Sequence, residues 1–216
     1  MPRQIASAIV VALVTSLLVA ASAGAKDREK GPKELLAEAK IGANSRAPEL
    51  VDYVKLGRRD AKEAGVPEEI AAQLPLVSES LPLVPSEIEE ASVSRRLQSR
   101  KRIASWAGCW RATWRRGAGT WPYHRDIYQE TTWCTTIYNT VGSYSGRSWP
   151  HTGYGCSPNY GPTYQRTGGG VGYSSVDIET RGGFNCNVYW YGIQTWLWMV
   201  PRYYGDGRTA MAGWGE

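Results

Sequence analysis

The chain has little of what holds a metal ion or a nucleic acid. Its 216 residues include two histidines and four cysteines, and no two cysteines lie within four residues of each other. Zinc sites usually space cysteine ligands that closely, and neither histidine has a neighbouring histidine or cysteine. The sequence therefore predicts no metal and no cofactor. The second half also lacks a basic stripe, so no nucleic-acid partner is expected.

Motifs of catalysis are also missing. The chain has no G-x-S-x-G nucleophile motif, the glycines at 168–170 lack the lysine of a phosphate loop, and GDGR offers one aspartate, too few for calcium. The one candidate row is His124, Asp126, Tyr128 and Glu130, which would share a strand face about 7 Å apart. We predict no enzyme; the alternative is an exported hydrolase that uses His124, Asp126 and Glu130.

Long apolar runs are absent except at the start. Arg3 precedes an apolar stretch from about Ile5 to Ala21, and the small residues Ala23-Gly24-Ala25 follow it. This order is typical of a cleaved secretory signal, and the run is shorter than a bilayer span of about 20 residues. We predict a signal peptide at 1–25, a secreted protein and no transmembrane segment after cleavage; the alternative is an uncleaved anchor.

Lysine is missing after Lys101, and this marks a change of composition near residue 104. All ten tryptophans, twelve of the thirteen tyrosines and 19 of the 24 glycines lie beyond that point. We therefore expect two parts after the signal. Residues 26–103 form a stalk, linker or pro-region, and residues 104–216 form a folded domain.

Residues 26–103 are predicted to be partly helical and loosely ordered. Prolines could open short helices at KELLAEAK, at ELVDYVKLGRRDAKEA (49–64) and at EEIAAQL (68–74), and Ser86 with Glu89 fits a capping box for a further helix. LPLVSESLPLVP (74–85) reads as a stiff spacer. The basic run Arg95–Arg102 is a linker or, alternatively, a cleavage site that releases an antagonistic peptide.

Residues 104–216 are predicted to form an antiparallel β-sandwich of about seven strands. Tyr, Trp and Thr occur there in short runs separated by turn residues, which is the usual pattern of such folds. GAGT (117–120) and Gly205–Gly207 supply the first and last hairpin turns. The expected strands are Cys109–Arg116, Trp121–Gln129, Thr132–Asn139, Val171–Thr180, Asn185–Tyr191, Gln194–Pro201 and Thr209–Trp214.

Four cysteines lie in this domain, and in an exported chain they are expected to form two disulfides. They allow three pairings. We favour Cys109–Cys134 with Cys156–Cys186, because each bridge then closes one local loop.

The surplus of aromatic residues is the main functional signal. The second half holds 23 aromatic side chains, more than a small core needs, and exposed aromatic groups mark interaction sites. The stretch from Trp149 to Tyr164 resembles a ligand-binding loop in composition, with rigid rings separated by small and polar residues. Its alternative is a loop whose rings only cover the end of the sheet. The predicted binding residues are Trp149, His151, Tyr154, Tyr160 and Tyr164.

The densest aromatic stretch, YWYGIQTWLWMV (189–200), is predicted to be core instead. Two strands joined near Gly192 would place Trp196 and Trp198 on one face and Leu197 and Met199 on the other. Both faces are apolar, so we expect a central strand that is covered on both sides.

The motifs GCWRATW, TTWCTTIY, RSWPHTGYG, TGGGVGYSS, GGFNCNVYW and GDGRT occur in this order. In them the second half resembles a group of small secreted, disulfide-containing β-sandwich proteins of high-GC Gram-positive bacteria. The resemblance implies export and a disulfide-tied sandwich, and it implies no active site. The resemblance and the surplus of aromatic rings together lead us to expect a secreted, non-enzymatic binding module for a glycan or cell-wall polymer.

Overall fold

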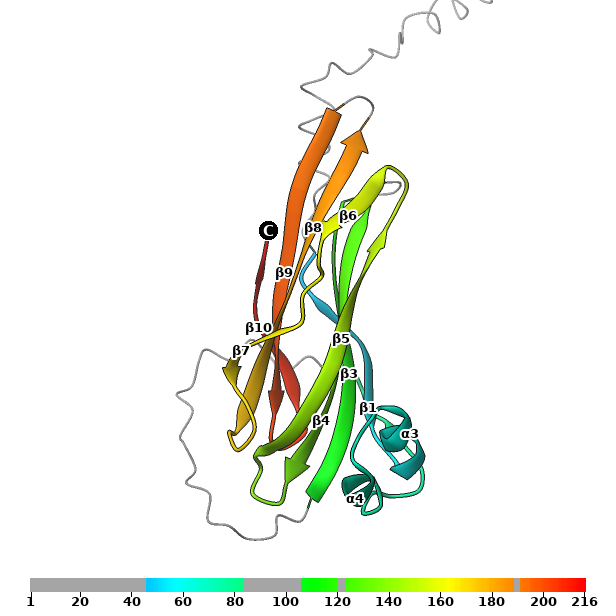
Figure 1. Cartoon of the computed structure of the whole chain (residues 1–216), viewed down its shortest axis with the longest axis vertical. Helices are drawn as coiled ribbons and strands as arrows, with labels where there is room; N and C mark the ends of the chain where they lie inside the picture. The colour runs from blue at the N-terminus through cyan, green and yellow to red at the C-terminus, as the bar shows by residue number, and fades with distance from the viewer. Residues whose placement is uncertain (1–45, 84–105, 120–122, 189–190) are drawn as a thin grey trace, which may run out of the picture. The chain divides into compact units, whose positions relative to one another are not determined.

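The computed structural model describes residues 46–83, 106–119, 123–188 and 191–216. These residues form mainly two antiparallel sheets with one core between them (Figure 1). The predicted all-β sandwich with two disulfides, Cys109–Cys134 and Cys156–Cys186, is confirmed. The predicted signal peptide, the first and last predicted helices and the basic run Arg95–Arg102 lie outside the described residues.

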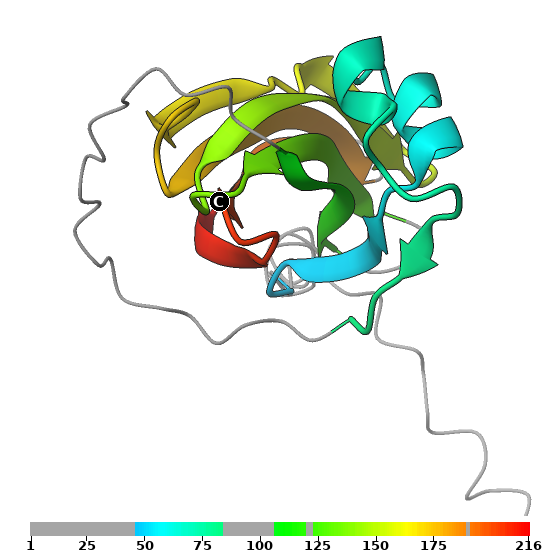
Figure 2. The ribbon, with the colours of Figure 1, turned by 90° about the horizontal axis from the view of Figure 1, so that it is seen from below.

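The two sheets have simple, mostly sequential strand orders. The first sheet contains, in spatial order, β2 (Glu79–Ser80), β1 (Glu49–Lys55), β3 (Trp106–Ala118), β4 (Arg125–Thr136) and β5 (Val141–Thr152). The second contains β10 (Thr209–Gly215), β9 (Tyr191–Tyr204), β8 (Ser175–Val188) and β6 (Cys156–Tyr160), and β7 (Gln165–Gly169) also pairs with β8. Seen along the strands, the sheets curve around a shared interior (Figure 2).

Side-chain alternation along the strands assigns the faces as predicted. In β3, Trp110, Ala112 and Trp114 belong to the core, and Arg111 and Arg115 lie on the outer face. In β8, Val176 and Ile178 are in the core. This pattern is expected for strands whose sheet is packed on one side only.

The helix predicted at 49–64 is wrong for its first half. Residues 49–55 form β1, which pairs antiparallel with β3 and buries Leu50 in the sandwich core. Valine and tyrosine suit a strand when a neighbouring edge is available, and such tertiary pairing overrides helix propensity. β1 and β2 precede the boundary that composition places near residue 104, and yet they belong to the same sheet as β3.

Two short helices cover one end of the outer face of the first sheet. They are α3 (Arg58–Glu63) and α4 (Glu68–Ala71), and Figure 1 shows them beside the lower end of β3. Their buried side chains pack with Leu56 and Leu74 against the Cys109–Cys134 disulfide. No described helix covers the other end of the same face. The candidate functional site lies at that uncovered end.

Several strand predictions in the second half need correction. The strands predicted at 171–180 and 185–191 are joined in one strand, β8, which runs from Ser175 to Val188. β4 runs without a break through the gap predicted between Gln129 and Thr132, and β5 occupies residues predicted to begin a binding loop. β5 holds Gly146 and Pro150, which weaken a strand prediction. Proline is tolerated here because β5 is the last strand of its sheet and needs partners on one side only. The strands β6 and β7 also form in residues outside the expected strands.

The described part of the stretch 189–200 is core on one face only. The structure places β8 up to Val188 and β9 from Tyr191, so Gly192 lies inside β9 and is not the join between the strands. Leu197 and Met199 are fully buried as predicted, but Trp196 is 39% exposed. The prediction that both faces are covered is therefore wrong for Trp196. It lies on the outer face of the second sheet, where Tyr160 covers it in part.

Candidate functional site

The end of the first sheet that α3 and α4 leave uncovered brings polar and aromatic side chains together. We call it the open face, and three cross-strand rows build it. It comprises Glu49 on β1, Arg115 on β3, His124, Asp126, Tyr128 and Glu130 on and just before β4, and Arg147, Trp149 and His151 on β5.

The middle row of the open face is aromatic. Arg115, Tyr128 and Trp149 lie directly opposite one another on β3, β4 and β5. The rings of Tyr128 and Trp149 are nearly parallel, with 5.4 Å between their centroids. The guanidinium of Arg115 lies 5.8 Å from the centroid of Tyr128, and that of Arg147 lies 5.2 Å from the centroid of Trp149. The two rings are thus held in place between two cations.

Ion pairs balance the charges on this face. Arg115 contacts Glu49 at 3.0 Å and Asp126 at 3.2 Å. Glu130, directly opposite Arg147, contacts it at 3.1 Å. Each arginine therefore has a carboxylate partner, and the face has no excess of positive charge.

The third row contains a cluster of two histidines and an aspartate. Asp126 is 3% exposed, and its Oδ2 lies 3.5 Å from Nδ1 of His151, its partner across the strand pair. The rings of His124 and His151 have centroids 5.3 Å apart. One ligand atom from each of the three residues lies within 4.8 Å of the others. The two histidines are close in space although 27 positions separate them along the chain, and the spacing of the histidines in the sequence does not reveal this.

Gly117 makes room for the Asp126 carboxylate. It lies opposite Asp126 on β3, and a Cβ atom at Gly117 would come within 2.1 Å of Asp126 Oδ1. Both described polar contacts of the carboxylate, to Arg115 and to His151, are made by the other oxygen, Oδ2. Oδ1 therefore lies against the glycine.

A groove of about 320 Å³ adjoins this cluster, and Arg46, Glu49, Arg115, His124 and Asp126 line it. Burial lowers the pKa of the Arg115 guanidinium, but Asp126, Tyr128 and Glu49 outweigh it, so the net pKa lies above its usual value. Burial also raises the pKa of Tyr128, against the opposing effect of Arg115. Tyr128 is therefore a neutral hydroxyl and Arg115 a permanent cation at neutral pH.

The structure separates the predicted binding residues. Trp149 and His151 lie together on the open face. Tyr154 is 82% exposed in the turn after β5, and Tyr160 lies on β6, where it packs against Trp196 with centroids 5.5 Å apart. Tyr164 is half-buried, its hydroxyl is 3.2 Å from that of Thr131, and burial raises its pKa to about 12. The five residues therefore do not form one site.

The predicted catalytic row is brought together only in part. His124 and Asp126 lie in one cluster, but Glu130 is ion-paired with Arg147 in a different row. Sequence reasoning missed Arg115 and Arg147 as members of the face. The strand register could have shown both residues, because Arg115 lies opposite Tyr128 and Arg147 lies opposite Glu130.

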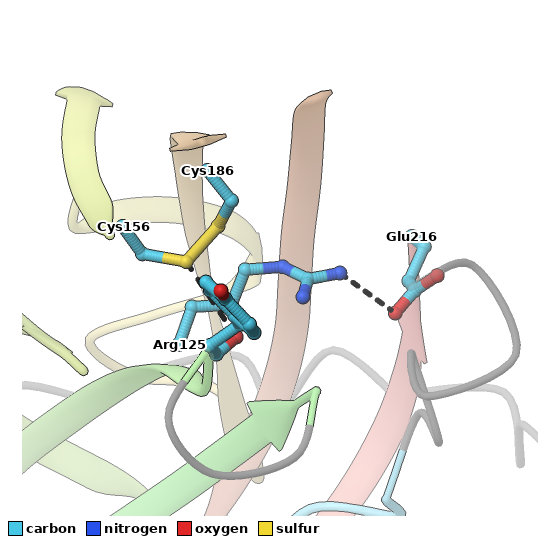
Figure 3. Close-up of a disulfide and its surroundings, with 5 residues drawn as sticks. Arg125, Cys156, Cys186 and Glu216 are labelled. Atoms are coloured by element: carbon cyan, nitrogen blue, oxygen red, sulfur yellow. Dashed lines mark hydrogen bonds and ion pairs between the residues drawn. A yellow bond between two sulfur atoms is a disulfide. The ribbon is translucent and has the colours of Figure 1, made fainter. Parts of the chain in front are cut away.

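A second polar cluster lies inside the sandwich near Asp126. Arg116 and Arg125 are 0% and 4% exposed, and burial lowers the pKa of both. Arg125 lies 3.9 Å from the carboxylate of Glu216, beside the Cys156–Cys186 disulfide (Figure 3). Arg116 donates a hydrogen bond to the carbonyl of Gly215. These contacts join the last strand to the β3–β4 hairpin and are best explained as structural.

The fold and the open face together define an all-β sandwich whose outer face carries a half-buried aromatic pair between ion-paired side chains. Comparisons with family models, with curated proteins and with solved structures gave no match. Among the described residues, no helix has the length and apolar character that a membrane crossing requires.

Proposed function

We propose that this protein is a secreted, non-enzymatic binding module that holds a glycan or the glycan part of a cell-wall polymer on the open face. The observation that supports this most is the stacked Tyr128–Trp149 pair, which forms the middle row of the open face together with Arg115, a residue that lines the groove.

Sugar rings have apolar C–H faces and polar edges, and proteins bind them with aromatic rings flanked by hydrogen-bonding side chains. Trp149 offers the ring, and the side chain that covers it, Arg147, is 73% exposed and can move at small cost. Arg115 and Glu130 flank the rings, and together with the Tyr128 hydroxyl they can bond to sugar hydroxyls from several sides.

The charge balance favours a neutral ligand over an anionic one. A surface built for phosphate-rich polymers carries unpaired arginines or lysines, whereas Arg115 and Arg147 both have carboxylate partners. A neutral polysaccharide or the glycan strand of peptidoglycan fits this surface better than a nucleic acid or a teichoic acid.

The extracellular setting is supported by the two disulfides. Both join directly opposite residues of neighbouring strands, and disulfides persist in oxidising compartments. The apolar run near the amino terminus of the sequence also supports export.

The test is a binding screen of the purified chain against insoluble polysaccharides and peptidoglycan, followed by a soluble oligosaccharide of any polymer that retains it. We expect retention that high salt does not abolish, because the ligand is neutral. If no polymer retains the protein, or if only anionic polymers retain it and salt releases it, the proposal fails.

A further inference from the structure

We propose that His124, Asp126 and His151 form a binding site for one divalent transition-metal ion of the zinc type. This inference does not depend on the proposed glycan binding. It rests on a cluster that brings two imidazoles and one carboxylate together at the edge of a groove.

The residue types fit this class of ion. Imidazole nitrogen and carboxylate oxygen are common ligands of zinc, at about 2.0–2.2 Å from the metal. Two histidines with one carboxylate hold three positions and leave at least one for water or another ligand. Calcium and magnesium are less suitable, because they prefer sites built from oxygen alone.

The distances fit with a small adjustment. Two ligands of a tetrahedral zinc ion are about 3.3 Å apart, and Asp126 Oδ2 and His151 Nδ1 are already 3.5 Å apart. The widest ligand–ligand distance in the cluster is within 4.8 Å, so the remaining pairs must close by about 1.5 Å or less. His151 can supply this movement because its side chain is 60% exposed.

The neighbouring side chains hold the carboxylate ligand in place. Asp126 is nearly buried, and Arg115 contacts its Oδ2 at 3.2 Å, as supporting groups do in many metal sites. The positive charge of Arg115 opposes a metal ion, but Glu49 contacts Arg115 at 3.0 Å and offsets it. Oδ1 lies against Gly117, where a side chain would block it. The site therefore combines two histidine ligands that are exposed or half-exposed with one carboxylate ligand that its neighbours hold in place.

The experiment uses the full chain, without a histidine tag, after treatment with a chelator. Zn²⁺ is titrated by calorimetry, and Co²⁺ is titrated in parallel because its visible absorption reports tetrahedral coordination. We expect one ion per chain and a visible Co²⁺ band that Zn²⁺ abolishes. His151→Ala and Asp126→Asn should each weaken binding at least tenfold.

Tyr154→Ala is the control, because Tyr154 is 82% exposed in the turn that follows β5 and lies outside the cluster. It should bind metal as the parent chain does. His151→Ala should keep the parent melting temperature in the absence of metal, which shows that lost binding is not lost folding. Binding of less than one ion per chain, or equal affinity of the parent and His151→Ala, overturns the proposal. Failure of glycan binding would leave this result unchanged.

Discussion

Gly117 is the position on the open face with the least space for a larger side chain. A Cβ atom there would overlap Asp126 Oδ1, while Gly192, in β9, would place its Cβ no closer than 3.5 Å to another atom. Glycine within a strand normally costs stability relative to alanine. We infer that glycine occurs at position 117, despite this loss of stability, because a larger side chain would overlap the Asp126 carboxylate.

Gly117→Ala is therefore predicted to destabilise the protein by about 1–3 kcal/mol, the usual range for overpacking. Gly192→Ala, the matched control, should be neutral or slightly stabilising. Chemical denaturation measures both. In the double variant Gly117→Ala/Asp126→Ala the overlap is removed, so its loss should be smaller than the sum of the two single losses. Equal effects of the two glycine substitutions would contradict this account.

At the scale of elements, a buried polar network joins the two sheets. Gln129 on β4 donates a hydrogen bond to the Tyr203 hydroxyl on β9 at 3.0 Å and accepts one from the Thr180 hydroxyl on β8 at 2.7 Å. All three side chains are fully buried. Buried polar groups without partners are costly, so this network favours one alignment of the sheets.

Gln129→Leu is predicted to lower the free energy of unfolding by about 3 kcal/mol, because it removes the hydrogen bonds that Gln129 makes with two buried hydroxyl groups. Gln194 is an exposed glutamine on β9 and offers the same substitution at a site outside the core. Urea unfolding of Gln194→Leu should differ from the parent by less than about 0.5 kcal/mol. A similar small effect at Gln129 would show that the network is not important for stability.

The elements also show what sequence can and cannot predict. The faces of β3 and β8 followed from alternation, and the disulfide pairing followed from local loop closure. β5 did not, because Gly146 and Pro150 are poor strand residues and are tolerated only at a sheet edge. β1 did not, because its structure depends on a partner more than 50 residues later in the chain. For the same reason the candidate site was predicted only in pieces. Trp149 and His151 were predicted as binding residues and Asp126 and Tyr128 as part of a separate row, but the sequence did not show that these residues lie opposite each other.

At the scale of the whole molecule, one sheet contains strands from both halves of the sequence. β1 pairs with β3 from Glu49 to Lys55, and the segment after it covers the Cys109–Cys134 disulfide. Removing residues 46–83 would expose Leu50's core neighbours and that disulfide to water.

A chain cut within Arg95–Arg102 by a site-specific protease is therefore predicted to stay together. Both fragments should elute as one species in size-exclusion chromatography without denaturant, and should separate in urea. This outcome would mean that cleavage there does not by itself release an aromatic-rich peptide. Independent elution of the two fragments in native buffer would contradict the assignment of β1 to the sheet.

The central claim is that the open face, and not the exposed pair of Trp196 and Tyr160, binds the ligand. Trp149 and Trp196 allow a direct comparison, because they lie on the outer faces of different sheets. The measurement is the Kd of a retained oligosaccharide for Trp149→Ala and for Trp196→Ala. We expect Trp149→Ala to weaken binding about tenfold or more, near 1.4 kcal/mol, and Trp196→Ala to leave it within about twofold. The reverse result, or equal binding by both variants and the parent, would contradict the claim.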